Sequence, residues 1–154
     1  MKTLLATAGA FALLTTSMTN AADTNPAADA MSPLLAPWVG PYGGVPPFDQ
    51  VKVGDLKPGL ETGMAQQLAE IDRIANDPAA PTFENTIAAM ERSGRTLDRV
   101  ATVYGVYSST LNDEAVQAVE REMAPKLAAF SDQITQNPQL FERIRQVRTA
   151  GMTA

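Results

Sequence analysis

An unbroken apolar stripe between residues 83 and 111 constrains the fold of this 154-residue chain more than any other feature. Its members recur at alternating steps of four and three residues, which is the spacing of one face of an α-helix. They are Phe83, Ile87, Met90, Gly94, Leu97, Ala101, Tyr104, Ser108 and Leu111. Because the spacing does not shift at Gly94, it predicts one helix over about 83–110, on the order of 42 Å long and bent at most at that glycine.

Side-chain size also repeats along this stripe. Large side chains occupy every seventh residue from Phe83 to Leu111, and small ones occupy Gly94, Ala101 and Ser108. A column of small side chains lets a neighbouring helix approach closely, and a seven-residue spacing favours nearly antiparallel packing. We therefore expect the closest contact of this helix to lie along its small side chains.

Another helical pattern begins at residue 56. Asp55 is its expected N-cap, and Pro58 falls in the first turn, where its missing amide does no harm. Gly59 and Gly63 each weaken a helix by roughly 1 kcal/mol relative to alanine, so packing has to offset them. The apolar face of this helix comprises Leu56, Leu60, Met64, Leu68, Ile71 and Ala75.

Two further helices are predicted after residue 111. Asn112 is the expected cap of the first of them, and Pro125 inside it predicts a kink. Asn137 and Pro138 start the last helix, with proline at the first helical position, and its pattern stops in residues 148–154. The expected buried faces are Val116, Val119, Met123, Leu127, Phe130 and Ile134 on one helix, and Leu140, Phe141, Ile144 and Val147 on the other.

These patterns predict an all-α fold, an up-down array of about four helices with short loops over residues 48–150. Residues 22–47 are expected to form a flexible leader followed by a proline-rich arm. Proline fixes φ and lacks an amide donor, so the arm suits neither a helix nor a central strand. Its apolar side chains predict an extended segment that packs on another surface, and they are Leu34, Leu35, Trp38, Tyr42 and Phe48.

The first 21 residues have the order of a secretory signal peptide. Lys2 precedes an apolar run over 4–14, and the small residues Thr19 and Ala21 occupy the −3 and −1 positions of a cleavage site. A membrane anchor is the alternative, but eleven helical residues span roughly 16 Å, well short of the ~30 Å hydrocarbon core. The pattern therefore predicts an exported protein, periplasmic or secreted, that is not membrane-bound after cleavage.

Composition excludes several classes of function. The sequence contains no histidine and no cysteine. It cannot build a His-based triad, a Cys–His dyad, a His- or Cys-ligated zinc site or a disulfide. The formal net charge is −5, and no basic stripe is available for a nucleic-acid backbone, so we expect no nucleic-acid partner.

The carboxylates and arginines offer two candidate sites. Glu120 and Glu122 lie two residues apart on a helix, so they face different directions and cannot share a proton. Glu114 and Glu120 are no better placed. Paired-carboxylate catalysis is therefore not supported. Arg92, Arg95 and Arg99 share a helix face and suit an anion, but Glu91 and Asp98 interleave with them and favour local pairing. No calcium-loop pattern is present.

The remaining candidates carry hydroxyl groups. Tyr104 lies on the apolar stripe and Tyr107 beside it, so packing is the favoured role, with hydrogen bonding to a ligand as the alternative. Ser108, Ser109 and Thr110 have no base to activate them. We therefore assign no catalytic, metal-binding or cofactor-binding residue to this chain from its sequence.

Three stretches, at residues 35–64, 76–100 and 120–144, carry a family resemblance. Their most specific parts are GPYGGVPPFD at residues 40–49 and PTFENT at residues 81–86, with a small-residue step at 93–94. Over about 33–148, the sequence resembles the N-terminal region of the thimet oligopeptidase and peptidyl-dipeptidase (Dcp) family of zinc metallopeptidases. The resemblance is greatest to the bacterial peptidyl-dipeptidase branch.

The resemblance implies a much longer helical enzyme whose two lobes enclose a channel for short peptides. In that family, an H-E-x-x-H helix and a downstream glutamate hold zinc in the C-terminal half. None of these residues maps onto a chain without histidine. The resemblance thus predicts an inactive N-terminal fragment. Peptide substrates and zinc would be bound only by the missing C-terminal part of the intact enzyme.

A free-standing, exported helical module that binds or inhibits a partner is the alternative. The two hypotheses differ in the stability that they predict. Helices that evolved to pack on missing partners should leave an exposed apolar patch and give a loosely packed or aggregating monomer. Sharp, cooperative melting of a dilute monomer would instead favour the free-standing module.

Overall fold

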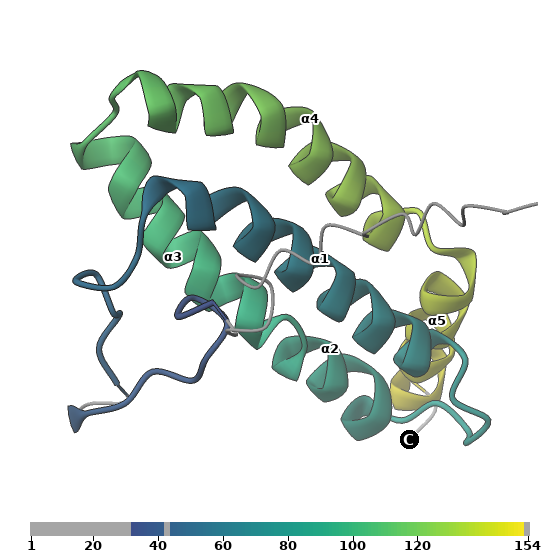
Figure 1. Ribbon diagram of the computed structural model, residues 1–154. Coiled ribbons are helices and arrows are strands. Elements are labelled where there is room, and N and C mark those ends of the chain that lie inside the picture. The colour runs from purple at the N-terminus through teal and green to yellow at the C-terminus, as the bar shows by residue number, and fades with distance from the viewer. Residues whose placement is uncertain (1–31, 42–43, 153–154) are drawn as a thin grey trace, which may run out of the picture.

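The computed structural model describes residues 32–41 and 44–152, and the predicted signal peptide lies outside this part (Figure 1). Within it, no β-strand is formed, and the isolated β-bridge pairs Val39 with Val45. The all-α prediction is therefore confirmed. The elements are α1 (Val53–Ala75), the π-helix η2 (Phe83–Ala88), α2 (Ala89–Arg92), α3 (Arg95–Thr110), α4 (Glu114–Thr135) and α5 (Pro138–Met152).

Helix α1 is central, with α3 running back along one side of it and α4 along the other (Figure 1). Most of its predicted apolar face is buried, and Leu68 is half-buried. The predicted start of the helix is wrong, because α1 begins at Val53 after the N-cap residue Lys52. The carboxylate of Asp55 accepts the Lys52 amide at 2.8 Å, so Asp55 closes the first turn from inside the helix.

The prediction of one continuous helix over 83–110 is wrong. The helical segment is interrupted at Ser93, whose backbone is extended, and at Gly94, which has a φ of 77°. A glycine adopts this left-handed conformation at little cost. The carboxylate of Glu70, on α1, accepts the amide of Gly94 at 2.7 Å and so satisfies the backbone at the break.

The interruption also changes which side chains are buried after it. The buried face of α3 contains Leu97, Val100, Val103 and Tyr107. In contrast to the prediction, Ala101 is exposed and Tyr104 and Ser108 are half-buried, and the two ends of the predicted stripe, Phe83 and Leu111, are 65% and 58% exposed. A π-helical turn and a left-handed glycine both change the direction in which the following side chains point. Residues that continue the helical spacing through them therefore no longer lie on the buried face.

Close contact between α1 and α3 depends on two glycines of α1. It does not depend on the small side chains predicted to line the contact, Gly94, Ala101 and Ser108. A Cβ atom on Gly63 would lie 2.9 Å from Cα of Leu97. A Cβ atom on Gly59 would lie 3.2 Å from side-chain atoms of both Leu34 and Val100. The two glycines that weaken α1 as an isolated helix therefore let its backbone pack directly on α3.

The last two helices begin close to their predicted positions. Asp113, not Asn112, caps α4, and its carboxylate accepts the Val116 amide at 2.9 Å. Asn112 instead adopts a φ of 36° in the connection. Helix α4 continues through Pro125 without interruption. The side chain of Asn137 accepts the Leu140 amide at 2.9 Å, which caps α5 at its predicted start.

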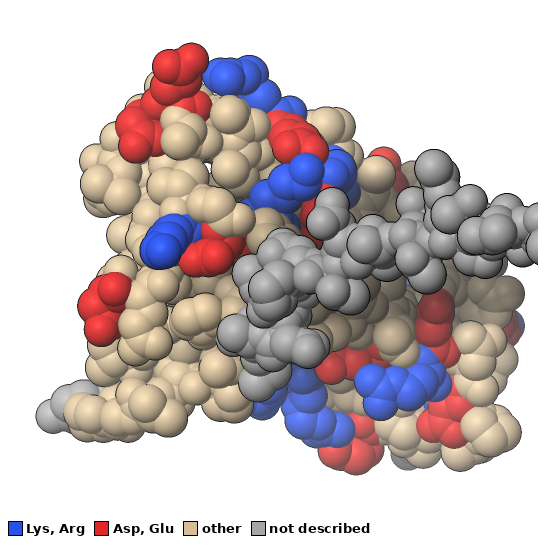
Figure 2. All heavy atoms as spheres, viewed as in Figure 1, with Lys and Arg blue, Asp and Glu red and all other residues tan. Residues whose placement is uncertain are grey.

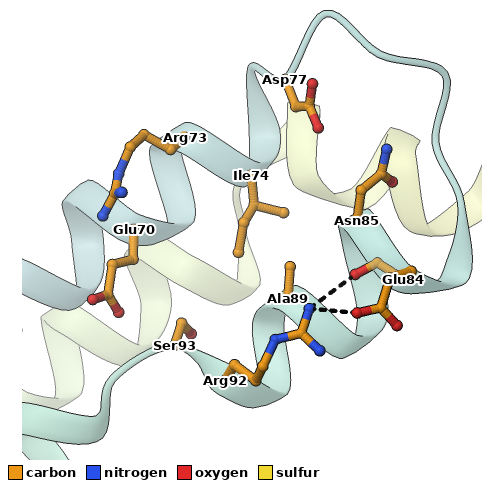
Figure 3. Close-up of a pocket in the computed structure, with 9 residues that line it drawn as sticks. All are labelled: Glu70, Arg73, Ile74, Asp77, Glu84, Asn85, Ala89, Arg92 and Ser93. Carbon is orange, nitrogen blue, oxygen red and sulfur yellow. Dashed lines mark hydrogen bonds and ion pairs between the residues drawn. The ribbon is translucent and has the colours of Figure 1, made fainter.

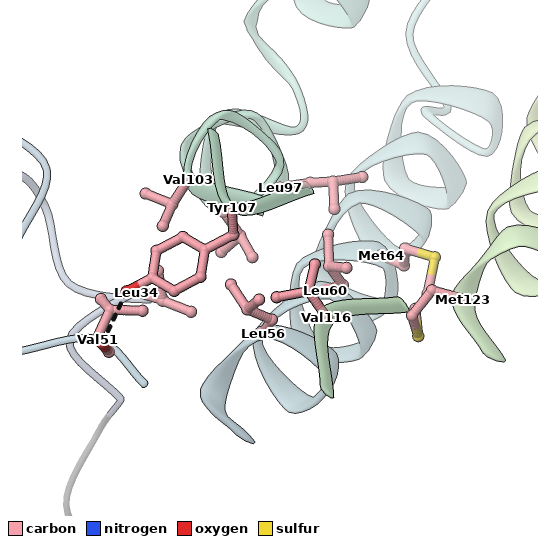
Figure 4. Close-up of a cluster of buried hydrophobic side chains, with 11 residues drawn as sticks. Leu34, Val51, Leu56, Leu60, Met64, Leu97, Val103, Tyr107, Val116 and Met123 are labelled. Atoms are coloured by element: carbon pink, nitrogen blue, oxygen red, sulfur yellow. Dashed lines mark hydrogen bonds between the residues drawn. The ribbon is translucent and has the colours of Figure 1, made fainter. Parts of the chain in front are cut away.

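Two clusters of side chains form the core. The larger joins the arm to α1, α3 and α4 and contains Leu34, Val51, Leu56, Leu60, Met64, Leu97, Val100, Val103, Tyr107, Val116 and Met123 (Figure 4). The smaller joins α1 to α5 through Ile71, Ala75 and Leu140. No helix of the described residues is both long and apolar enough to cross a membrane.

The arm is tied to the larger cluster by aromatic and polar contacts. Leu34 is fully buried, and Trp38 packs against the cluster from its edge. The hydroxyl of Tyr107 donates to the Val51 carbonyl at 2.9 Å (Figure 4). Phe48 stacks on Tyr107 with ring centroids 6.5 Å apart. The predicted contact residue Tyr42 lies outside the described residues.

Candidate functional site

A groove of about 520 Å³ lies between the C-terminal half of α1 and the η2–α2 segment (Figure 3). Its size falls within the range of roughly 300–1,000 Å³ that small-molecule sites occupy. The lining residues are Glu70, Arg73, Ile74, Asp77, Glu84, Asn85, Ala89, Arg92 and Ser93. Both walls therefore carry charged side chains, and Ile74 and Ala89 supply apolar surface between them.

The η2–α2 wall contains an internal ion pair. Arg92 Nη2 lies 2.8 Å from Oε1 of Glu84 and donates to the Glu84 backbone carbonyl at 3.4 Å (Figure 3). The pair lies along one side of the groove and is exposed to solvent, with 53% of the Arg92 side chain and 74% of the Glu84 side chain accessible. On the opposite wall, Nε of Arg73 donates to the Ala69 carbonyl at 3.2 Å within α1.

The connection between α1 and η2 closes one end of the groove. Arg143, on α5, is only 6% exposed. Its Nη1 donates to the carbonyls of Asp77 and Ala79, at 2.6 and 3.2 Å, and its Nη2 lies 3.5 Å from the Asp77 carboxylate. A buried guanidinium thus holds the connection against α5.

A capping box is formed where this connection enters η2. Thr82 Oγ1 accepts the Asn85 amide at 3.1 Å, and Asn85 Oδ1 accepts the Thr82 amide at 2.7 Å. The Asn85 side chain also donates to the Ala80 carbonyl at 3.0 Å. These reciprocal bonds give Thr82 and Asn85 of the PTFENT stretch a structural role at the start of η2.

The groove has no nucleophile with a base. The hydroxyl of Ser93 donates to the Met90 carbonyl at 2.7 Å, and the sequence supplies no imidazole to activate it. Among residues 32–41 and 44–152, no three Asp or Glu side chains gather as a metal site would require. The donors present therefore do not fit a zinc ion, which prefers nitrogen and sulfur ligands. The polar lining of the groove consists of charged side chains together with Asn85 and Ser93.

A separate ion-pair network joins α1 to α4. Glu122 pairs with Lys57, and Lys126 pairs with Glu61. Lys126 also lies 3.5 Å from Glu122, so the four side chains form one chain of alternating charge. The hydrogen bond from Lys57 lowers the pKa of Glu122, and the hydrogen bond to Glu61 raises the pKa of Lys126.

This network should make the fold sensitive to acid. The folded-state pKa of Glu122 lies below its ordinary value of 4.5, so its ionised form stabilises the fold at neutral pH. That stabilisation is lost as the pH falls through the folded-state pKa. We expect Glu122→Gln to lose less stability than the wild type between about pH 7 and about pH 3, measured by urea unfolding at low salt.

Glu120→Gln is the matched control, because it replaces a half-buried carboxylate within α4 that belongs to no ion pair of the described residues. This control should follow the wild type over the same pH interval. An acid-induced loss of stability in Glu122→Gln as large as that of the wild type would contradict the prediction.

Comparison with known proteins identifies relatives of a segment of this chain. No family model matches the chain. The chain is 36% identical over 116 residues to the dipeptidyl carboxypeptidase of Salmonella typhimurium, and 35% identical over 117 residues to the dipeptidyl carboxypeptidase of Escherichia coli. Over this segment, the chain is a homologue of the dipeptidyl carboxypeptidases. The matches cover 75% and 76% of this chain, but only 17% of each relative.

The arginines predicted as an anion site are not brought together in the structure. Arg92 lies before the helix break and pairs with Glu84. Arg99 lies after it and donates to the Leu35 carbonyl at 3.2 Å. Arg95 is exposed. The break at Gly94 thus separates residues that a continuous helix would have aligned.

The other sequence candidates have structural roles. Burial, with a smaller effect of the Glu120 charge, raises the pKa of Tyr104, which is half-buried at the edge of the core. Ser108 donates to the Gly105 carbonyl, and Ser109 and Thr110 both donate to the Val106 carbonyl. Glu122 belongs to the α1–α4 network, so it pairs with lysines and not with Glu120.

Sequence reasoning missed the residues that shape the groove, notably Glu70, Arg73 and Arg143. For Arg143, a signal was available, because it lies on the same face of α5 as Leu140 and Ile144, among apolar residues. No comparable signal marks Glu70 or Arg73, which are ordinary charged residues of an amphipathic helix until the fold places them against η2 and α2.

Proposed function

We propose that this chain is the N-terminal helical segment of an exported zinc peptidase of the dipeptidyl carboxypeptidase type, and that it is inactive alone. The observation that carries the proposal is the 36% identity over 116 residues to the dipeptidyl carboxypeptidase of Salmonella typhimurium, of which these residues represent 17%. In the intact protein, the segment would pack on the catalytic part and limit access of substrates, which would be short peptides.

The composition of the chain supports a role in packing and not in metal binding. With neither histidine nor cysteine in its sequence, the chain has no zinc-preferring ligand. The metal and the general base would therefore come from the remainder of the longer protein. The signal-like pattern of residues 1–21 supports export.

Exposed aromatic side chains support a role in packing. Phe83, at the start of η2, and Phe141, in the first turn of α5, are each 65% exposed. The catalytic part of the longer enzyme is the partner that this proposal assigns to them.

The proposal can be tested with the Escherichia coli relative. The aligned segment of that enzyme is deleted in one variant and replaced by residues 33–148 of this chain in another. We expect the deletion variant to lose its release of dipeptides from a short N-blocked peptide, and the replacement variant to recover a measurable part of it. The 154-residue chain alone, supplied with zinc, should release none.

Two outcomes would contradict the proposal. One is dipeptide release by the chain alone, at a rate that survives removal of contaminating proteases. The other is a deletion variant as active as the intact relative, since the segment would then have no role in the enzyme. Circular dichroism of both variants distinguishes loss of activity from loss of the remaining fold.

A further inference from the structure

The two core clusters meet α1 at different places along its length. The larger cluster contains eleven buried residues, and the smaller contains three, which are Ile71, Ala75 and Leu140. In the part of the chain that the structure describes, no residue belongs to both clusters. Between Met64 and Ile71, over residues 65–70, α1 buries no side chain. The two clusters are therefore separated by a stretch of the central helix that lacks a core.

The helix break at Ser93 and Gly94 lies at the same boundary. Before the break, Met90 of α2 packs against the smaller cluster, and after it, Leu97 of α3 belongs to the larger cluster. Neither α1 nor the segment that packs along it thus carries a continuous core across this level of the molecule. Boundaries of this kind separate parts of a protein that can open independently of each other.

Helix α5 is attached to the smaller side of this boundary through few buried groups. In the described residues of α5, the buried side chains are Leu140, which packs on Ile71 and Ala75, and Arg143, which donates to carbonyls of the α1–η2 connection. Nε of Arg143 is buried and has no hydrogen-bond partner among the described residues. Water would satisfy this donor once α5 detached, so opening recovers part of its cost.

The exposed charges of α5 add little to its attachment. Glu142 pairs with Arg145 of the same helix at 2.7 Å, in contact with solvent. On the face seen in Figure 2, acidic and basic side chains are interspersed, without a block of one sign that would attract the helix. The attachment of α5 therefore rests mainly on Leu140 and Arg143.

We propose that α5 and the connection at residues 76–82 open together as one unit, here called the α5 unit, while α1, α3 and the arm stay folded. The opening costs less free energy than global unfolding, because it exposes the smaller cluster and leaves the larger one intact. Since the connection closes one end of the groove beside α1, access to the groove at that end depends on the α5 unit. This inference goes beyond the proposed function, because it concerns this chain by itself.

The test is native-state amide hydrogen exchange of the full 154-residue chain over a series of low urea concentrations. Relative to unfolded-chain rates, the amides of Ile144 and Val147 in α5 should exchange at least about ten-fold faster than those of Val100 and Val103 in α3. Their opening free energy should fall with urea along a non-zero slope that is smaller than the slope of α3, since fraying of single residues has no such slope.

Gly63→Val separates the two sides of the boundary, because residue 63 contacts Leu97 in the larger cluster. The exchange of Val100 and Val103 should become about 100-fold faster, which corresponds to about 3 kcal/mol. The acceleration in α5 should be at least about ten-fold smaller, because its opening leaves the α1–α3 contact in place. If this variant does not fold, the two urea slopes of the wild type decide the question.

Leu140→Ala tests whether α5 and the connection open together. Loss of this buried side chain should accelerate exchange in α5 and at residues 77–82 equally, by at least about 30-fold. The proposal would be overturned by one common free energy and slope for α3 and α5, by equal acceleration of both in Gly63→Val, or by unchanged exchange at residues 77–82 in Leu140→Ala. None of these results affects the peptidase test, which depends on the relative's catalytic part.

Discussion

Replacing Gly63 with valine should lower the free energy of unfolding by about 3 kcal/mol. A Cβ atom at this position would lie 2.9 Å from Cα of Leu97, so the new side chain meets backbone and cannot be accommodated by a rotamer change. The two helices must move apart, which loosens the contacts of Leu60 and Val100 in the same interface. Urea unfolding should show a lower midpoint at an unchanged slope.

Gly105→Val is the matched control for this prediction. Gly105 also lies within a helix, but a Cβ atom there would meet nothing within 4 Å. Because valine favours a helix slightly more than glycine does, this variant should be as stable as the wild type or somewhat more stable. Equal destabilisation by the two substitutions would show that helix propensity, and not the α1–α3 contact, governs both.

Arg143→Met should cost about 2–3 kcal/mol. The guanidinium is the donor for two backbone carbonyls of the α1–η2 connection, and methionine fills a similar volume without any donor. The expected cost is below that of a fully buried ion pair because the Asp77 side chain is 30% exposed and water can reach it. Urea unfolding measures the loss, and faster amide exchange over residues 77–82 should accompany it.

Arg145→Met, on the same helix, provides the comparison. Arg145 pairs with Glu142 one turn away and is exposed, so its replacement should leave the unfolding midpoint nearly unchanged. If both variants unfolded at the same urea concentration as the wild type, the buried guanidinium would have no structural importance.

Sequence periodicity was sufficient to predict the helices that pack with one uninterrupted face. In α1, the buried residues Leu56, Leu60, Met64, Ile71 and Ala75 keep the helical spacing from end to end, and the prediction was correct apart from its starting residue. The cap of α4 was misplaced by one residue. Asn112 and Asp113 are both good N-cap residues, so the sequence alone does not distinguish them.

The break at Ser93 and Gly94 could not be predicted from local pattern, because its acceptor is 24 residues away on another helix. The apolar residues on both sides happen to keep a helical spacing, although two separate helices carry them. The groove escaped prediction for the same reason. Each of its charged residues belongs to a solvated helix surface when read alone, and only the packing of α1 on η2 and α2 makes Glu70, Arg73, Glu84 and Arg92 neighbours.

The hydrogen bond between Glu70 and Gly94 limits how α1 can move relative to the junction of α2 with α3. The acceptor is a side chain of the long central helix, and the donor is the main chain at the junction of α2 with α3. If the central helix turned about its own axis or slid by one turn, this bond would break and the junction would lose its acceptor. Any such rotation or sliding of α1 therefore carries the cost of a lost hydrogen bond, about 1 kcal/mol, in addition to the cost of repacking.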